Sequence, residues 1–447
     1  MWDAMRGIKK ALTKIRGGAH VPHFKDTAER ESVKMTAPAT VILPMQQHIG
    51  APCKPTVAVG DQVAVGQVIG DTDAFVSAPI HASVSGKVKA IAPFLLSSGG
   101  TVDAIHIESD GQNTLWEGIC PPEVQGKEDF LKAVRASGLV GIGGAGFPTH
   151  VKLNIKEGVK IDTLVINAAE CEPYITSDYR EMMESYADVI SGAARVLEYV
   201  GIETCLIGIE SNKPKAIAKL AEIIVSLGLD DKINVVEVPS HYPYGAEKML
   251  AYALTGRQIP LGGLPSDVGL AVLNVSSVAI LNRYLETGVP LVEKRVTVTG
   301  GAIAAPQNVF VPLGTSIQEV VDFCGGYAQT PEKVIMGGPM MGVSQYDGSA
   351  PIIKQNNCIL CLTKGETFEP IDEPCIRCGR CVSACPMQLL PTMIERYAKS
   401  ENAEMLKKLN VQGCMECGSC AYACPARRPL VQYLKRGKQV ERKAVAK

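Results

Sequence analysis

Eight of the chain's 15 cysteines fall into two runs that share one internal spacing, C-x2-C-x2-C-x3-C-P. Three thiolates on such a tight loop reach three corners of an iron–sulfur cubane, and the fourth cysteine, which starts a helix, binds the other cluster. The proline that follows stops this helix from running backward through the ligand loop. We therefore predict two [4Fe–4S] clusters and single-electron transfer, with zinc as the alternative. The two ligand sets are Cys375, Cys378, Cys381 and Cys424, and Cys414, Cys417, Cys420 and Cys385.

A glycine-rich turn at residues 141–149 (GIGGAGFPT) offers a second kind of chemistry. Such a turn leaves backbone N–H groups free to surround a phosphate, and Lys152 just beyond it adds a positive charge. The turn departs from the dinucleotide-binding fingerprint because no strong strand precedes it. The glycines alone predict a phosphate site, and a tight turn that binds nothing is the alternative.

The full string is more specific than its glycines. With Lys152 it resembles the FMN loop of the NADH-oxidising subunit of respiratory complex I, G-x-G-G-A-G-F-P-T-x-x-K. Three further segments resemble motifs of that family and follow in its order: residues 167–173 (NAAECEP), 242–247 (YPYGAE) and 274–277 (NVSS). The resemblance implies a flavin site that also receives NAD(H).

Roles for single residues follow from the same resemblance. The residues implied to hold FMN are Gly141, Gly143, Gly144, Gly146, Lys152, Asn167 and Asn274. Phe147, Glu172 and Glu247 are implied to face NADH, and Glu170 is implied to lie beside the flavin, so the three glutamates are the predicted catalytic residues. Ala169, Ala246 and Ser276 replace acidic residues of that family. An iron–sulfur relay that binds no nucleotide therefore remains an alternative.

The elements that position these residues alternate between strand and helix from about residue 128 to 290. Strands are predicted at 162–168, 204–210 and 233–238, with helices at 177–200 and 214–227. This rhythm is typical of an α/β domain with a parallel sheet.

Two β-rich segments flank the α/β domain. Residues 36–110 are short Val- and Ile-rich β segments that resemble the half-motifs of biotinyl/lipoyl barrel-sandwich domains. The hairpin tip carries His81, Ala82 and Ser83 in place of a modified lysine, which favours a scaffold over a carrier domain. Residues 295–340, with a short helix near 316–324, resemble the ubiquitin-like β-grasp (SLBB) domain. Cys358 and Cys361, a C-x-x-C without a partner pair, are interpreted as buried cysteines rather than a third metal site.

Composition limits the class of protein. A chain of 447 residues with 46% hydrophobic and 20% charged residues is a folded protein of several domains. Its net charge of -1 argues against nucleic acid as a partner. The bunched cysteines favour a reducing compartment, and no run of 18 apolar residues is present to span a bilayer. Residues 1–16 are predicted to form a basic amphipathic helix, which docks on a partner or membrane or packs on its own protein.

The order of these parts resembles one family over essentially the whole chain, the RnfC subunit of the Rnf complex. The chain also has Gly17-Gly18-x-His20 followed by Pro22. The predicted fold class is multidomain α/β and α+β. The predicted parts are an N-terminal helix and arm (1–35), a barrel-sandwich domain (36–127), a Rossmann-like FMN/NADH domain (128–290), an SLBB β-grasp domain (291–364), and a helical two-cluster ferredoxin-type domain with a basic tail (365–447).

The resemblance implies an NADH-linked flavin and iron–sulfur oxidoreductase subunit that lies peripherally on the cytoplasmic face of a membrane. Its implied partners are the other subunits of a complex that couples electron flow between ferredoxin and NAD to Na⁺ or H⁺ transport. The enzyme alternative is a cobalamin reductase of the propanediol-utilisation type. That family begins close to the flavin domain, whereas a further domain precedes it here.

Overall fold

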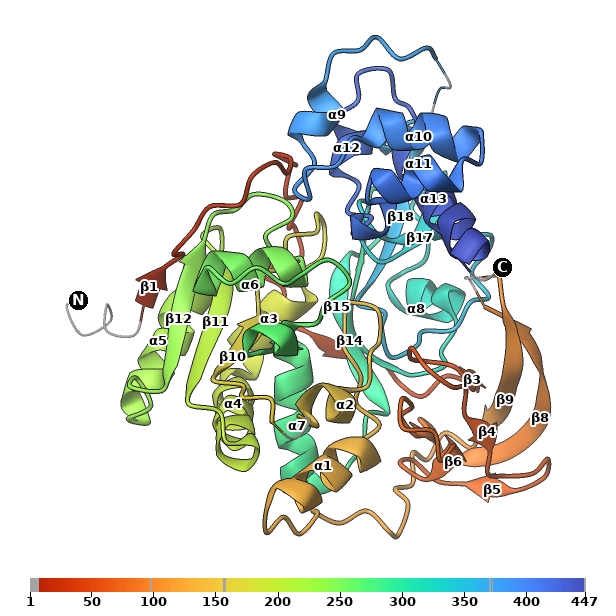
Figure 1. The fold of residues 1–447 in the computed structure, drawn as a ribbon. Helices are drawn as coiled ribbons and strands as arrows, with labels where there is room; N and C mark the ends of the chain where they lie inside the picture. Colours follow the sequence, from red (N-terminus) through yellow and green to blue (C-terminus); the bar gives the residue numbers. More distant parts are fainter. Residues whose placement is uncertain (1–7, 97–98, 156–157, 370, 372, 446–447) are drawn as a thin grey trace.

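The computed structural model describes residues 8–96, 99–155, 158–369, 371 and 373–445. A parallel-sheet domain lies beside a β-grasp domain, the barrel-sandwich domain packs at one end, and a helical C-terminal domain lies at the other (Figure 1). In this described part of the chain, no helix combines the length and the apolar character needed to cross a bilayer.

The parallel-sheet domain has five strands in the order β1-β12-β11-β10-β13, and all neighbours are parallel. The chain winds outward from β10 through β11 to β12 and then returns to place β13 on the other side of β10. The direction of winding therefore reverses between β10 and β13. The strands are β1 (Ile8–Lys10), β10 (Thr163–Asn167), β11 (Thr204–Glu210), β12 (Ile233–Val238) and β13 (Leu270–Asn274). The helices are α1 (Lys127–Ala136), α2 (Thr149–Leu153), α3 (Ser177–Glu184), α4 (Tyr186–Val200), α5 (Pro214–Ser226), α6 (Glu247–Thr255), η2 (Pro265–Val268) and α7 (Val275–Thr287).

Two predicted helices are wrong in this domain. The segment 177–200 forms two helices, because Ser185 between α3 and α4 has a non-helical φ of -123°. The N-terminal helix is absent from residues 8–16, and residues 1–7 lie outside the described part. Ile8–Lys10 instead adds a strand to the edge of β12. This pairing satisfies backbone groups of β12 that a helix would leave unpaired, and a short isolated helix is only marginally stable.

The β-grasp domain has a six-stranded sheet in the order β17-β16-β18-β14-β15-β2. The predicted helix near 316–324 is present as α8, and Ser316 caps its N-terminus by accepting a hydrogen bond from the Glu319 N–H. Cys358 and Cys361 lie on β18, three residues apart, so their side chains point to opposite faces and pack in separate cores, as buried cysteines do. The elements are β2 (Val33–Lys34), β14 (Glu293–Thr299), β15 (Gln307–Pro312), α8 (Ile317–Phe323), β16 (Lys333–Met336), β17 (Val343–Gln345), β18 (Cys358–Leu362) and η3 (Lys364–Glu366).

The barrel-sandwich domain has two sheets, β3-β9-β8-β5 and β4-β6-β7. Its hairpin tip is buried against neighbouring domains: His81 lies against Gly138, and the Ser83 hydroxyl donates to the carbonyl oxygen of Leu313. The fully buried Lys354 joins three domains, because its ammonium donates to the carbonyl oxygens of Pro79 (2.6 Å) and Gly138 (2.7 Å). The strands are β3 (Thr40–Pro44), β4 (Lys54–Pro55), β5 (Gln62–Val63), β6 (Val68–Asp71), β7 (Ile80–His81), β8 (Gly86–Leu95) and β9 (Thr101–Ser109).

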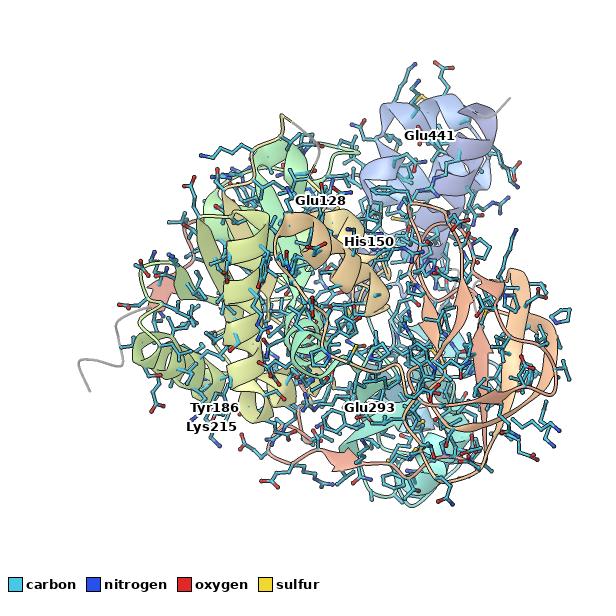
Figure 2. All side chains as sticks on the ribbon, turned by 90° about the horizontal axis from the view of Figure 1, so that it is seen from below. Glu128, His150, Tyr186, Lys215, Glu293 and Glu441 are labelled. Atoms are coloured by element: carbon cyan, nitrogen blue, oxygen red, sulfur yellow. The ribbon has the colours of Figure 1, made fainter. Side chains whose placement is uncertain are left out.

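The C-terminal domain is helical and has its own small core around Ile394, Leu406 and Leu430. Its longest helix, α13, carries Glu441, which lies on the opposite side of the molecule from Tyr186 and Lys215 of the parallel-sheet domain (Figure 2). The elements are α9 (Arg380–Ser383), α10 (Pro391–Lys399), α11 (Ala403–Lys408), η4 (Val411–Gly413), α12 (Ser419–Tyr422) and α13 (Leu430–Val445).

Candidate functional site

Asn167 and Asn274 are the last residues of β10 and β13, and they lie opposite each other in the register of the two strands. Their position is the carboxyl edge of the sheet at the point where the winding reverses, which is where open α/β sheets bind ligands. The Asn167 amide donates to the carbonyl oxygen of Gly245 (2.7 Å). Asn274 caps α7 by accepting hydrogen bonds from the N–H groups of Ser276 and Ser277.

The glycine-rich loop is shaped as a phosphate cradle requires. Gly143 and Gly146 both have a φ of 70°, a conformation that favours glycine. A Cβ on Gly143 would lie 2.9 Å from the Asn357 side chain, and one on Gly146 would lie 2.2 Å from Gln355. A Cβ on Gly144 would meet nothing within 4 Å. The loop therefore excludes side chains where it packs and faces open space at Gly144, and it fits the phosphate of FMN.

A lysine and a glutamate from separate helices meet at the same edge of the sheet. The Lys152 ammonium, on α2, lies 3.2 Å from the carboxylate of Glu247 in the first turn of α6. It also donates to the carbonyl oxygen of Val272 on β13 (3.2 Å). The structure thus brings Lys152, Glu247, Asn167 and Asn274 together at the switch point. Phe147 is half-buried in the glycine loop.

The Glu170 carboxylate binds the start of helix α3. Its carboxylate accepts the backbone N–H groups of Asp178 (2.6 Å) and Tyr179 (3.3 Å) at the start of α3. Burial is the main cause that raises the pKa of this carboxyl group, and Lys25 opposes the rise. These contacts attach residues 167–173, the acidic segment, to α3. The geometry therefore favours a role for Glu170 in positioning this segment over a direct contact with the flavin.

Two lysines that sequence reasoning missed hold the acidic segment after β10. The Lys25 ammonium, from the N-terminal arm, donates to the carbonyl oxygens of Glu170 (3.0 Å), Glu172 (2.8 Å) and Ile175 (2.5 Å). The Lys213 ammonium donates to the carbonyl oxygen of Ala169 (2.7 Å). No local pattern marked Lys25, because all three of its acceptors are distant in sequence.

A carboxylate reaches the position where the complex I family has a glutamate and this chain has Ser276. Asp178, on α3, accepts hydrogen bonds from the Ser276 hydroxyl (2.7 Å) and from the Asn274 amide (2.8 Å). Burial raises the pKa of Asp178, and these two donors oppose the rise. Sequence reasoning missed Asp178, although an acidic residue in the first turn of a helix is a recognisable signal.

Glu172 lies between the parallel-sheet domain and the β-grasp domain. Its Oε2 accepts the backbone N–H of Met340 in the β16–β17 turn (3.1 Å), while its Oε1 is buried with no hydrogen-bond partner among the described residues. Burial raises the pKa of Glu172 to about 7, and the backbone N–H groups of Met340 and Met341 and the charge of Lys25 oppose the rise.

This raised pKa predicts a pH-dependent stability. Folding favours the protonated carboxyl group, so its stabilisation is complete below the ordinary value of 4.5 and is lost as the pH rises towards 7. Glu172→Gln keeps an acceptor for Met340 without the charge. The variant is expected to exceed the stability of the parent by about 1 kcal/mol at about pH 5.5 and by roughly 3 kcal/mol at about pH 8. Hydrogen exchange of amides around Met340 measures the difference.

The exposed Glu404 provides the control. Its carboxyl pKa lies below the usual value because of its hydrogen bond to Lys408, so Glu404→Gln should show a constant difference from the parent over the same interval. If the parent and Glu172→Gln had the same pH slope, Glu172 would not be the titrating group.

The two cysteine runs fold in the same way. Arg377 and Glu416 hold equivalent places in the two loops, with φ values of 58° and 61°. The N–H of Arg377 lies 3.4 Å from the Cys375 Sγ, and that of Glu416 lies 3.4 Å from the Cys414 Sγ. Each run continues into a short helix, α9 or α12, after a glycine in the left-handed conformation.

Thiols from the two runs are interleaved. Burial raises the pKa of the Cys381 thiol, and the neighbouring thiols of Cys424 and Cys375 raise it further. Burial likewise raises the pKa of the Cys420 thiol, with further contributions from Cys414, Cys417 and Cys385. Each of these sets joins one loop to the fourth cysteine of the other, which fits the ligand exchange of a two-cluster ferredoxin. Among the described residues, no three His, Cys, Asp or Glu side chains are close enough together to bind one metal ion. A [4Fe–4S] cubane does not need such a group, because each of its four thiolates binds a different iron.

One of the two thiol sets lies against the parallel-sheet domain. The Tyr242 hydroxyl donates to the carbonyl oxygen of Cys417 (2.7 Å). Gly17 packs on the backbone of Cys385, where a Cβ would lie 2.7 Å from the carbonyl group. Cys375 and Cys378, in the other set, are exposed. The set that contains Cys417 therefore lies against residues 242–247, and the other set reaches the surface.

Comparison with known families accounts for most of the chain. Residues 134–283 match the Nuo51 FMN-binding domain, and residues 13–112 match the RnfC barrel sandwich hybrid domain. Residues 295–344 match the SLBB domain, and residues 370–425 match a 4Fe-4S dicluster domain. The predicted fold class and the predicted cofactors, FMN and two clusters, are confirmed.

Three relatives match over nearly the whole length. A subunit of the proton-translocating ferredoxin:NAD(+) oxidoreductase complex of Clostridium ljungdahlii is 44% identical and covers 97% of this chain and 95% of its own length. Its counterpart in the Na(+)-translocating complex of Acetobacterium woodii is 44% identical, covering 95% and 96%. The corresponding subunit of the ion-translocating oxidoreductase complex of Rhodobacter capsulatus is 41% identical, covering 96% and 84%. A chain of an NAD+-reducing [NiFe]-hydrogenase, 17% identical over 71% of this chain and 63% of its own length, superposes with a TM-score of 0.49.

Proposed function

Because the chain belongs to the RnfC family of ion-translocating ferredoxin:NAD⁺ oxidoreductase complexes, we propose that electrons pass through it between NAD(H), FMN and two [4Fe–4S] clusters. Its partners are the other subunits of that complex, with ferredoxin reached through one of them. Its place is peripheral, on the cytoplasmic face of the membrane. The barrel-sandwich match ahead of the FMN domain favours this function over a cobalamin reductase.

The switch point between β10 and β13 supports the assignment of the flavin site. Bound FMN would accept one hydride, that is two electrons, from NADH and would release these electrons one at a time, as iron–sulfur clusters require. The glycine loop and Lys152 would hold its phosphate, with Asn167 and Asn274 beside the ring. Glu247 would orient the nicotinamide nucleotide together with Phe147 and Glu172. Glu170 would keep the acidic segment in place through α3.

The thiol sets support an order for the clusters. The site of Cys385, Cys414, Cys417 and Cys420 is the nearer one to residues 242–247, which include Glu247, since Tyr242 bonds directly to Cys417. The site of Cys375, Cys378, Cys381 and Cys424 would exchange electrons with a partner, since two of its cysteines are exposed.

The observation that carries the proposal is this hydrogen bond of Tyr242, because Tyr242 begins the segment that also supplies Glu247. The test is anaerobic reconstitution of the full chain followed by measurement of iron, sulfide and FMN, and then titration with NADH. We expect one FMN, two clusters, and bleaching of the flavin and cluster absorbance by NADH. Full cofactor content without bleaching would support a relay that binds no nucleotide, and absence of sulfide would overturn the cluster assignment.

A further inference from the structure

Lys438 places a positive charge on the ligand loop of the cluster nearer the parallel-sheet domain. Its ammonium donates to the carbonyl oxygen of Cys414 (2.9 Å) and pairs with the Glu416 carboxylate (2.7 Å). Only 14% of the Lys438 side chain is exposed, so water screens this charge little. Lys438 lies on α13, which packs along α10 and α11 and so fixes the lysine over the loop.

The other cysteine loop is charged differently, although its backbone is the same. Arg377 occupies the place of Glu416 and is exposed, and its φ of 58° matches the 61° of Glu416. Of the two loops, only the one with Glu416 has an acidic residue at this position, and this is also the loop that the buried Lys438 contacts.

Charge near a cluster changes how easily the cluster accepts an electron. Reduction adds one negative charge to the cluster, so a nearby cation stabilises the reduced form and a nearby anion destabilises it. Hydrogen bonds and charges around the ligands are known means of tuning a metal centre. Glu416 and Lys438 act in opposite directions on the same loop.

We propose that Lys438 is a redox-tuning residue, which offsets Glu416 and thereby raises the reduction potential of the cluster bound by Cys385, Cys414, Cys417 and Cys420. This inference rests on the proposed function, because it requires a cluster at that site. A purely structural role, in which Lys438 only attaches α13 to the loop, makes a different prediction for the variants below.

The test is an EPR-monitored redox titration of the anaerobically reconstituted full chain. At the potential where the parent cluster is half reduced, Lys438→Met should lower the ratio of reduced to oxidised cluster about tenfold, equivalent to about 59 mV for one electron. Glu416→Gln should raise the ratio, and the double variant should return close to the parent value. Lys435→Met is the matched control, since Lys435 is 49% exposed and 3.8 Å from Glu416; its ratio should change far less. The transition of the other cluster should move less than that of the tuned cluster.

Iron and sulfide content separates the two hypotheses. A chain without clusters overturns the proposed function, whereas a loaded chain tests the role of Lys438. The tuning role is overturned if loaded Lys438→Met keeps the parent potential, or if the double variant is displaced as far as Lys438→Met. Should Lys438→Met fail to hold a cluster, Glu416→Gln decides: an unchanged or lowered ratio overturns the proposal, and a raised one supports it.

Discussion

Replacement of Cys424 by alanine is expected to remove the cluster that is bound by Cys375, Cys378, Cys381 and Cys424. Cys424 is the last cysteine of the second run, but its thiol lies near that of Cys381 in the first run. It therefore belongs with the ligand set of the first run, which includes Cys375 and Cys378. Iron should fall from about eight to about four atoms per chain, because each [4Fe–4S] cluster is held by four thiolates. NADH-dependent reduction of an external one-electron acceptor should fall to background, because the lost cluster is the exposed one.

Thiol labelling identifies which cluster is lost. In Cys424→Ala, the exposed Cys375 and Cys378 become free thiols, and anaerobic alkylation of the native protein followed by mass spectrometry should find them labelled quickly. Cys385→Ala is the matched variant: it should free Cys417 and Cys420, which are only 7% exposed and should label slowly. If Cys424→Ala left Cys375 protected and freed the second run, the exchange of ligands between the runs would be wrong.

The parts of the fold that were predicted from the sequence are those that local pattern determines. The strands at 204–210 and 233–238 have the predicted bounds, because strands of a buried parallel sheet are continuous apolar runs. The helix after Ser316 is marked by its capping box. Residues 8–10, in contrast, belong to a segment whose sequence fits a helical period, and they form a strand. Their partner, β12, lies more than 200 residues away, and no local pattern announces such a pairing.

The candidate site shows the same division. Asn167, Asn274 and the glycines belong to motifs of adjacent residues, and the structure brings them together at one sheet edge. Lys25 and Lys438 act on carbonyl groups far from them in sequence, and backbone carbonyls carry no sequence signal. Their roles become visible only when the chain is folded.

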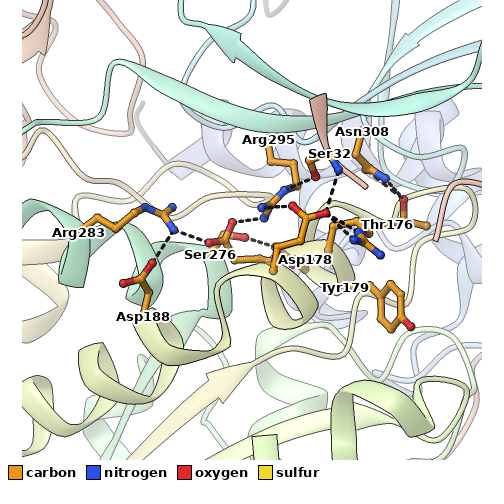
Figure 3. A network of polar contacts seen from close by, with 12 residues as sticks. Ser32, Thr176, Asp178, Tyr179, Asp188, Ser276, Arg283, Arg295 and Asn308 are labelled. Atoms are coloured by element: carbon orange, nitrogen blue, oxygen red, sulfur yellow. Dashed lines mark hydrogen bonds and ion pairs between the residues drawn. The ribbon is translucent and has the colours of Figure 1, made fainter. Parts of the chain in front are cut away.

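Replacement of Arg295 by methionine is expected to destabilise the junction of β14 and α3 by about 3–5 kcal/mol. The Arg295 guanidinium is 2% exposed, pairs with Glu181 and with Glu184 (2.9 Å), and donates to the Ser32 hydroxyl (2.8 Å) (Figure 3). It joins the β-grasp domain to the parallel-sheet domain and to the N-terminal arm. Methionine retains much of the packing volume but leaves Glu181, also 2% exposed, with Arg283 as its remaining cation. A buried carboxylate that loses a partner costs far more than a surface pair is worth.

The pH dependence distinguishes this cause from simple loss of packing. Burial alone would raise the pKa of Glu181, but Arg295 and Arg283 outweigh it, so the pKa lies below the ordinary 4.5. The parent therefore keeps this stabilisation above pH 4.5 and loses it in acid. In Arg295→Met the pKa should rise, so protonation relieves the unpaired charge and the difference from the parent shrinks as the pH falls. Hydrogen exchange of β14 amides measures the local free energy. Arg195→Met, at an exposed pair with Glu286, is the control and should cost about 0–1 kcal/mol. An equal cost for both arginines, or a difference independent of pH, would mean that the buried network contributes packing and not charge.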